Sequence, residues 1–258
     1  MAIKTRKISD WLSANGQAIT NASAASMKAY LEQNLRSLQD GVYIGKMQND
    51  GWGTQTGDEN AVIGSYKRIE PWQTTGIGIS SGDADAIVIQ HGGYRLGIAL
   101  TEPSNAMKWG SVQNASSVGY QTSGDLNTFD GSTRTAGIMA SSYYKNDDPA
   151  TYGVAYCWNY MTERTEGSKI CQIGKHNWWL PTMGDLALIH QHFETINLAL
   201  QRIKDAGKQS VSLLQRAGYW SCVEGSGAGA WSLGFDGGYR YGNGKVDSSL
   251  RVRPVTAF

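Results

Sequence analysis

The sequence has few cysteines, no long apolar run and almost no excess charge, and each shortage argues against a class of protein. Its three cysteines, Cys157, Cys171 and Cys222, form no Cys-x-x-Cys pair, so neither a zinc ribbon nor a thioredoxin-type site is indicated. The N-terminal residues lack the apolar run of a secretion signal, and no stretch of about 18 apolar residues predicts a transmembrane helix. For that reason we expect no membrane insertion. Because 23 Lys and Arg nearly balance 22 Asp and Glu, we also expect no nucleic-acid partner.

Glycine and large aromatic residues are what the sequence has in quantity. It contains 32 Gly, 9 Trp and 13 Tyr but only 4 Phe. This mixture favours a loop-rich fold held by large aromatic side chains. It is also typical of binding surfaces, where Tyr, Ser and Gly make adaptable contacts at low entropic cost.

The N-terminal region carries one helical pattern. Apolar residues at three- and four-residue spacing predict a helix over residues 22–39, with Asn34 in the apolar stripe. Two interpretations stay open: an oligomerising helix, or an ordinary amphipathic helix packed on its own domain.

The next hundred residues are punctuated by glycine and read as strands and loops. Residues 86–89 and 94–100 predict two strands around a His-Gly-Gly turn, and residues 76–80 predict a third. Clusters of Ser, Asn and Gly predict a loop over residues 103–135.

The second half begins with a predicted helix whose first turn holds Pro149, followed by a loop over residues 163–177. Thr182 and Asp185 form a capping-box pattern that opens a further helix. Its apolar stripe runs toward a stop at Gly207 through Leu186, Ile189, Phe193, Ile196, Leu200 and Ile203. Residues 219–258 then return to β-like alternation. The order helix, strands, helix, helix, strands predicts an α+β fold rather than βαβ units.

The C-terminal motifs resemble those of a known group. They are Trp179-Leu-Pro-Thr182 followed by Gly-Asp-Leu-Ala-Leu-Ile, then Tyr219-Trp-Ser221, Ala230-Trp231, Phe235 and Arg251-Val-Arg-Pro-Val255. From about residue 150 onward the chain is similar to the C-type lectin-like branch found in bacterial collagen-like adhesins and in variable proteins of diversity-generating retroelements. The resemblance implies two main helices, short twisted antiparallel sheets and long loops. Residues 1–45 would form an N-terminal helical oligomerisation or attachment segment, and residues 46–258 the ligand-binding domain, with a variable region at 219–258.

In that family a reverse transcriptase mutates adenines of a template repeat, which limits varied positions to residue types that NNC codons encode and leaves out Lys, Glu, Gln, Met and Trp. The resemblance implies variable, ligand-binding positions at Cys222, Val223, Gly225, Ser226, Gly227, Ala228, Gly229, Ser232, Gly234, Asp236, Gly237, Tyr239, Arg240, Tyr241, Gly242, Asn243, Gly244, Val246, Asp247, Ser248 and Ser249. The five excluded types make up about a fifth of the chain, so about four would be expected among these positions, and none occurs. Glu224, Trp231 and Lys245 belong to excluded types and would be constant.

A second set of residues would form the frame beneath the variable positions. The expected structural anchors are Trp179, Pro181, Trp220, Trp231, Phe235, Arg251, Arg253 and Pro254. Arg251 and Arg253 flank Val252 and so share one face of a strand, where we expect structural ion pairs. Tyr239 and Tyr241 likewise share a face, and tyrosines are frequent binding anchors.

Other candidate sites are weaker. Glu102-Pro-Ser-Asn105 is one residue longer than the calcium and sugar motif of animal lectins, and His190 and His192 lie too close in sequence to share a helix face. Asp147-Asp148 is interpreted as helix N-terminal charge rather than a cation site. The Gly-rich stretches at 225–229 and 76–78 lack the rest of a phosphate-binding loop. We therefore expect no metal and no cofactor.

The cysteines leave two possibilities: a Cys157–Cys171 disulfide, or free buried thiols, which we favour. An oxidase of the formylglycine-generating kind, which shares the broad fold, needs a copper-binding cysteine pair in the C-terminal core. Only Cys222 lies there, so no enzymatic activity is expected.

These observations favour a diversified ligand-binding protein. The resemblance implies a homotrimer at the tip of a phage tail fibre, in the virion or on an extracellular surface, whose partner is a bacterial surface receptor of protein or glycan. Two alternatives stay open: a cell-surface adhesin of fixed specificity that binds glycan or protein, and a remnant of an oxidase-like enzyme.

Overall fold

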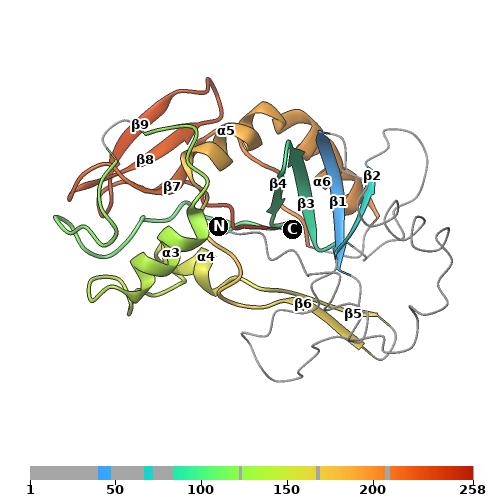
Figure 1. Cartoon of the computed structure of the whole chain (residues 1–258), viewed down its shortest axis with the longest axis horizontal. Coiled ribbons are helices and arrows are strands. Elements are labelled where there is room, and N and C mark those ends of the chain that lie inside the picture. Colours follow the sequence, from blue (N-terminus) through green and yellow to red (C-terminus); the bar gives the residue numbers. More distant parts are fainter. Residues whose placement is uncertain are drawn as a thin grey trace, which may run out of the picture. The chain divides into compact units, whose positions relative to one another are not determined.

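The computed structural model describes residues 40–47, 67–71, 84–121, 124–166, 169–206 and 210–257. These residues form an α+β fold with antiparallel sheets and four helices in the described ranges (Figure 1). The predicted helix over 22–39 and the predicted strand over 76–80 lie outside them. Residues from Asp40 onward form one compact unit, and its first strand, Gly41–Met47, spans the boundary expected at residue 45.

The largest sheet has five antiparallel strands in the order β10-β4-β3-β1-β2. Their bounds are Gly41–Met47 (β1), Lys67–Pro71 (β2), Ala86–His91 (β3), Tyr94–Ile98 (β4) and Val255–Ala257 (β10). The predicted strands 86–89 and 94–100 are thus confirmed as the hairpin β3–β4, whose turn holds Gly92 at φ +55°. Alternate residues of the hairpin, Ile87, Ile89, Leu96 and Ile98, face the main apolar core.

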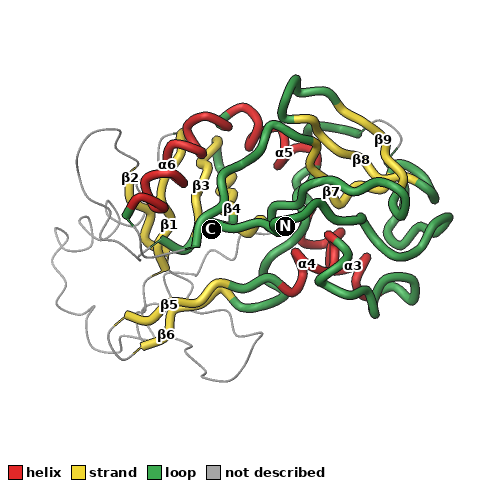
Figure 2. Tube along the Cα trace, turned by 180° about the vertical axis from the view of Figure 1, so that it is seen from behind, coloured by secondary structure: helices red, strands yellow, loops and turns green. Residues whose placement is uncertain are grey.

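The capping box predicted at Thr182 is confirmed at the start of helix α5, Met183–Gln191. Thr182 N donates to the Asp185 carboxylate at 2.9 Å, and Asp185 N donates to the Thr182 hydroxyl at 3.1 Å. The single long helix expected beyond it is wrong, because the chain turns at His192 and a second helix, α6, spans Phe193–Asp205. The turn allows α6 to pack on β1 and β3 while α5 packs on β7 and β8, as Figure 2 also shows.

Three other predictions need correction. The helix expected from Pro149 begins later, as α4 at Gly153–Asn159, because the Asp148 carboxylate accepts hydrogen bonds from the two residues after Pro149 and holds a turn there. Helix α3, Gly131–Ala140, begins inside the loop expected over 103–135. The loop expected over 163–177 contains an antiparallel hairpin of β5, Thr162–Glu166, and β6, Lys169–Ile173.

The C-terminal region forms a separate three-stranded sheet in the order β7-β8-β9. Its strands are Gly218–Glu224 (β7), Gly229–Gly234 (β8) and Arg240–Gly244 (β9). Figure 1 shows this sheet on the far side of α5 from the five-stranded sheet. The chain end joins the two sheets, since Trp220 N donates to Arg251 O at 2.9 Å and β10 pairs with β4.

Candidate ligand-binding surface

The outer edge of the C-terminal sheet is strand β9, and it carries exposed side chains. β8 pairs with β9 from Gly229 opposite Gly244 to Leu233 opposite Arg240. Tyr239 in the preceding turn and Tyr241 on β9 are 66% and 48% exposed, and their ring centroids lie 6.5 Å apart. The hairpin therefore presents two adjacent aromatic rings to solvent.

The expected variable positions divide into three groups by burial. The exposed ones are Ser226, Asp236, Gly237, Tyr239, Arg240, Tyr241, Gly242, Asp247 and Ser249. The half-buried ones are Gly225, Gly227, Ala228, Gly229, Asn243, Gly244, Val246 and Ser248.

The remaining four, Cys222, Val223, Ser232 and Gly234, are buried, so their expected role in a displayed surface is wrong for this structure. β7 is the strand of this sheet that faces the interior. It packs against α5 and α3, and Cys222 N donates to Pro181 O at 2.8 Å. Ser232 lies on the middle strand, where its hydroxyl accepts a hydrogen bond from Asn243 Nδ2 at 2.8 Å.

Two of the residues expected to be constant form an ion pair beneath the hairpin. Lys245 Nζ lies 2.6 Å from Glu224 Oε1, and both side chains are completely buried. Lys245 Nζ also donates to Ala115 O at 2.7 Å, while Glu224 Oε2 accepts from Ser117 N at 3.2 Å. Burial lowers the pKa of Lys245, and the Glu224 carboxylate counteracts that shift. The ion pair therefore holds both ends of the hairpin, residues 225–244, against one segment of the chain, residues 115–121.

Trp231, the third residue expected to be constant, is half-buried under another part of that segment. Its indole N–H donates to Gln121 O at 2.5 Å. Gly124 lies against the ring at φ +54°, and a Cβ there would stand 2.8 Å from Trp231 Cδ2. Sequence reasoning missed this packing, because the Ser, Asn and Gly clusters of residues 103–135 predict only a loop.

Tyr120 from the same segment is 49% exposed and lies beside the hairpin. Its hydroxyl stands 3.1 Å from the point that a Cβ on Gly227 would occupy. Sequence reasoning missed this residue, since one tyrosine in a polar loop carries no positional signal.

The ion pairs predicted for the two C-terminal arginines are confirmed, and both arginines share one acid. Arg251 Nη1 and Arg253 Nε lie 3.7 and 3.5 Å from the Glu102 carboxylate, which also accepts from Tyr219 Oη at 3.0 Å. Burial raises the pKa of Glu102, while Arg253, the Tyr219 hydroxyl and Arg251 oppose that shift. The Glu-Pro-Ser-Asn stretch thus supplies a structural acid to the frame.

The other expected anchors are placed in the interior. Trp179, Pro181, Trp220, Phe235 and Pro254 are buried. The Trp220 indole N–H donates to Met107 O at 2.8 Å, and Phe235 stacks on Tyr219 at 4.5 Å.

The titratable residues weighed as metal ligands or nucleophiles lie apart. No group of three or more His, Cys, Asp or Glu that could hold a metal occurs within the described ranges. Cys157 and Cys222 are free buried thiols, and burial raises the pKa of both. The His190 ring packs on Phe235 and the His176 ring stacks on Trp158. Asp147 accepts hydrogen bonds from Ser111.

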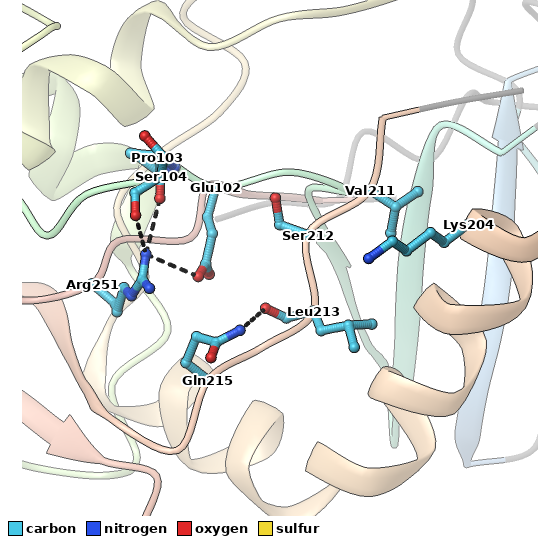
Figure 3. A pocket seen from close by; sticks show the side chains of 9 residues that line it. All are labelled: Glu102, Pro103, Ser104, Lys204, Val211, Ser212, Leu213, Gln215 and Arg251. Atoms are coloured by element: carbon cyan, nitrogen blue, oxygen red, sulfur yellow. Dashed lines mark hydrogen bonds and ion pairs between the residues drawn. The ribbon is translucent and has the colours of Figure 1, made fainter. Parts of the chain in front are cut away.

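A polar pocket of about 300 Å³ is lined by residues outside the hairpin (Figure 3). Six polar residues contribute to its lining: Glu102, Ser104, Lys204, Ser212, Gln215 and Arg251. None of them is an expected variable position.

Comparison with known proteins gives little further information. No protein-family model matches the chain, and no curated protein matches it. Among solved structures it is similar to the crystal structure of a fimbrial protein from Bacteroides ovatus ATCC 8483, with 14% identity and a TM-score of 0.40. The similarity covers 63% of this chain and 35% of the other, so the chain spans about a third of that protein's length. At this level neither fold nor function is transferred. In the described residues no helix is long and apolar enough to cross a membrane.

Proposed function

We propose that the protein is a diversified ligand-binding protein with a C-type lectin-like scaffold. Its exposed hairpin positions between residues 225 and 249 bind a bacterial surface receptor, in a homotrimer at the tip of a phage tail. Three like contacts would then add up to stable attachment even when each is weak.

One observation carries the proposal: the exposed positions of the hairpin and the ion pair beneath it differ in the residue types that NNC codons allow. The exposed positions of the hairpin are all of types that NNC codons allow. Glu224 and Lys245, which those codons do not encode, form the completely buried ion pair beneath. A system that mutates such codons would then change the exposed residues and leave the Glu224–Lys245 ion pair unchanged.

The chemistry of the exposed strip also suits binding. Tyr239, Arg240 and Tyr241 are consecutive and exposed. Tyr and Arg are enriched among the residues that dominate binding energy. Serine and glycine around them supply hydrogen bonds and close approach. The proposal assigns no chemical step to the chain, and burial raises the Cys222 pKa, which disfavours the reactive thiolate.

The test is binding of the fluorescently labelled full chain to a panel of intact bacterial strains. For a strain that binds, the Tyr239→Ala/Tyr241→Ala double variant should bind at least about tenfold more weakly, because truncated hot-spot residues cost about 2 kcal/mol or more. Tyr143→Ala is the matched control, since Tyr143 is 49% exposed but lies outside the hairpin. Equal loss in both variants, or none in either, would remove the hairpin as the binding surface.

A further inference from the structure

The polar pocket lies where four parts of the chain meet: the end of α6, residues 211–215, residues 102–104 and Arg251. Figure 3 shows Lys204 and Arg251 on opposite sides of it, with the Glu102 carboxylate between them. Because its lining residues all lie outside the expected variable positions, its specificity would be the same in every variant of the hairpin.

Positive charge exceeds negative charge around this pocket. Glu102 is the one acid among the lining residues that the structure describes, and it is already engaged by Arg251 and Arg253. Within the described residues Lys204 has no ion-pair partner, and its side chain is exposed. A ligand that brings its own anionic group therefore meets a free ammonium.

The buried guanidinium of Arg253, which contacts the lining residue Ser212, adds to the positive charge around the pocket. Arg253 Nη2 donates to Ser212 O at 2.6 Å, and its Nη1 has no hydrogen-bond partner in the described part of the chain. Among the described residues, Glu102 is the one acid paired with Arg253 and Arg251. An uncompensated positive charge in a buried setting acts strongly on an anion nearby, because the local dielectric is low.

The rest of the lining offers hydrogen bonds and an apolar flank. Gln215 Nε2 donates to Leu213 O at 3.1 Å, which leaves its Oε1 as an acceptor, and Ser212 presents a hydroxyl. Val211 and Leu213 are half-buried and apolar. This combination suits a ring with hydroxyl groups on its edge and C–H groups on its face.

We propose that this pocket binds an acidic sugar residue, whose carboxylate pairs with Lys204 and whose hydroxyls bond to Ser212 and Gln215. A volume of about 300 Å³ lies at the small end of known ligand sites, which span roughly 300–1,000 Å³, and fits a single sugar ring. The site does not depend on the diversified hairpin.

Isothermal titration calorimetry of the full chain tests the proposal with three probes: D-glucuronate, D-glucose and acetate. Glucuronate should bind saturably, and glucose and acetate should each bind at least about tenfold more weakly, since one loses a charge-assisted hydrogen bond and the other loses the ring contacts. Affinity for glucuronate should fall as salt rises.

Lys204→Gln should weaken glucuronate binding about tenfold while glucose binding stays unchanged. Lys145→Gln is the matched control, because Lys145 is exposed and does not line the pocket. Equal melting temperatures would show that both variants fold. No binding of glucuronate, acetate binding as tight as glucuronate, or unchanged glucuronate affinity in Lys204→Gln would each overturn the proposal.

Discussion

At the scale of single residues, the Glu224–Lys245 ion pair joins the two ends of the hairpin. Both side chains are fully buried, and Lys245 Nζ lies 4.9 Å from the centre of the Trp109 ring. A buried ion pair adds little over a well-packed apolar pair, but one partner left alone is costly. The pair therefore makes the two positions depend on each other.

Replacing Lys245 alone should consequently be severe. Lys245→Met leaves the Glu224 carboxylate buried without a cation, and we expect a loss of about 3–5 kcal/mol in the free energy of unfolding. The Glu224→Leu/Lys245→Met double variant should lose much less. Urea unfolding of the parent protein, Glu224→Leu, Lys245→Met and the double variant measures this, and additive losses would show that the pair is not coupled.

Asp185 gives the fold a predictable pH dependence. Complete burial raises its pKa from 3.8 to about 6, although hydrogen bonds from Thr182 and Tyr94 limit the rise. Between these values the folded state holds a proton that the unfolded chain releases, so stability falls as pH rises from about 4 to about 6, by about 3 kcal/mol.

Asp185→Asn removes this titration while keeping an oxygen that can accept from Thr182 N. In the variant, the free energy of unfolding should change between about pH 4 and about pH 7 by about 3 kcal/mol less than it does in the parent protein. Burial also raises the Glu102 pKa, so the comparison with the parent protein isolates the Asp185 part. The same pH dependence in both proteins would contradict the assignment.

At the scale of elements, burial decides which expected variable positions tolerate change. A Cβ on Gly242 would meet nothing within 4 Å. By contrast, a Cβ on Gly227 would stand 3.1 Å from the backbone of Asn114, and Cys222 is fully buried on β7. Diversity without loss of fold is therefore expected on β9 and not on β7.

Two tyrosine substitutions within this sheet test that division. Gly242→Tyr should change the free energy of unfolding by less than about 1 kcal/mol, because the residue points into open space on an edge strand. Cys222→Tyr should cost about 3 kcal/mol or more, because it overfills a packed interior. Thermal unfolding compares them, and similar melting temperatures would count against the division.

At the scale of the whole molecule, the sequence predicts those features that depend on neighbouring residues. The capping box at Thr182 and the β3–β4 hairpin follow from local spacing. Arg251 and Arg253 pair with one acid as expected, but they precede β10 and do not share the face of a strand. The β5–β6 hairpin also has a local signal in the sequence, since Gly167-Ser168 is a typical turn pair between two strand-like runs.

Other features could not be predicted because they join distant segments. Glu224 and Lys245 were expected to be constant, but their pairing depends on how the 115–118 segment folds over them. The polar pocket brings Glu102 to Lys204 and Arg251 across the whole described unit. Neither arrangement has a signature in the order of residues.

The central claim is that a fixed frame carries a diversified surface. Deep sequencing of the gene's 3′ end in a natural population tests it most directly. The account predicts substitutions confined to codons between 225 and 249, concentrated at exposed positions such as Tyr239, Tyr241 and Gly242, with Glu224, Trp231 and Lys245 unchanged. Uniform codons in this region, with changes scattered elsewhere, would contradict it and favour an adhesin of fixed specificity.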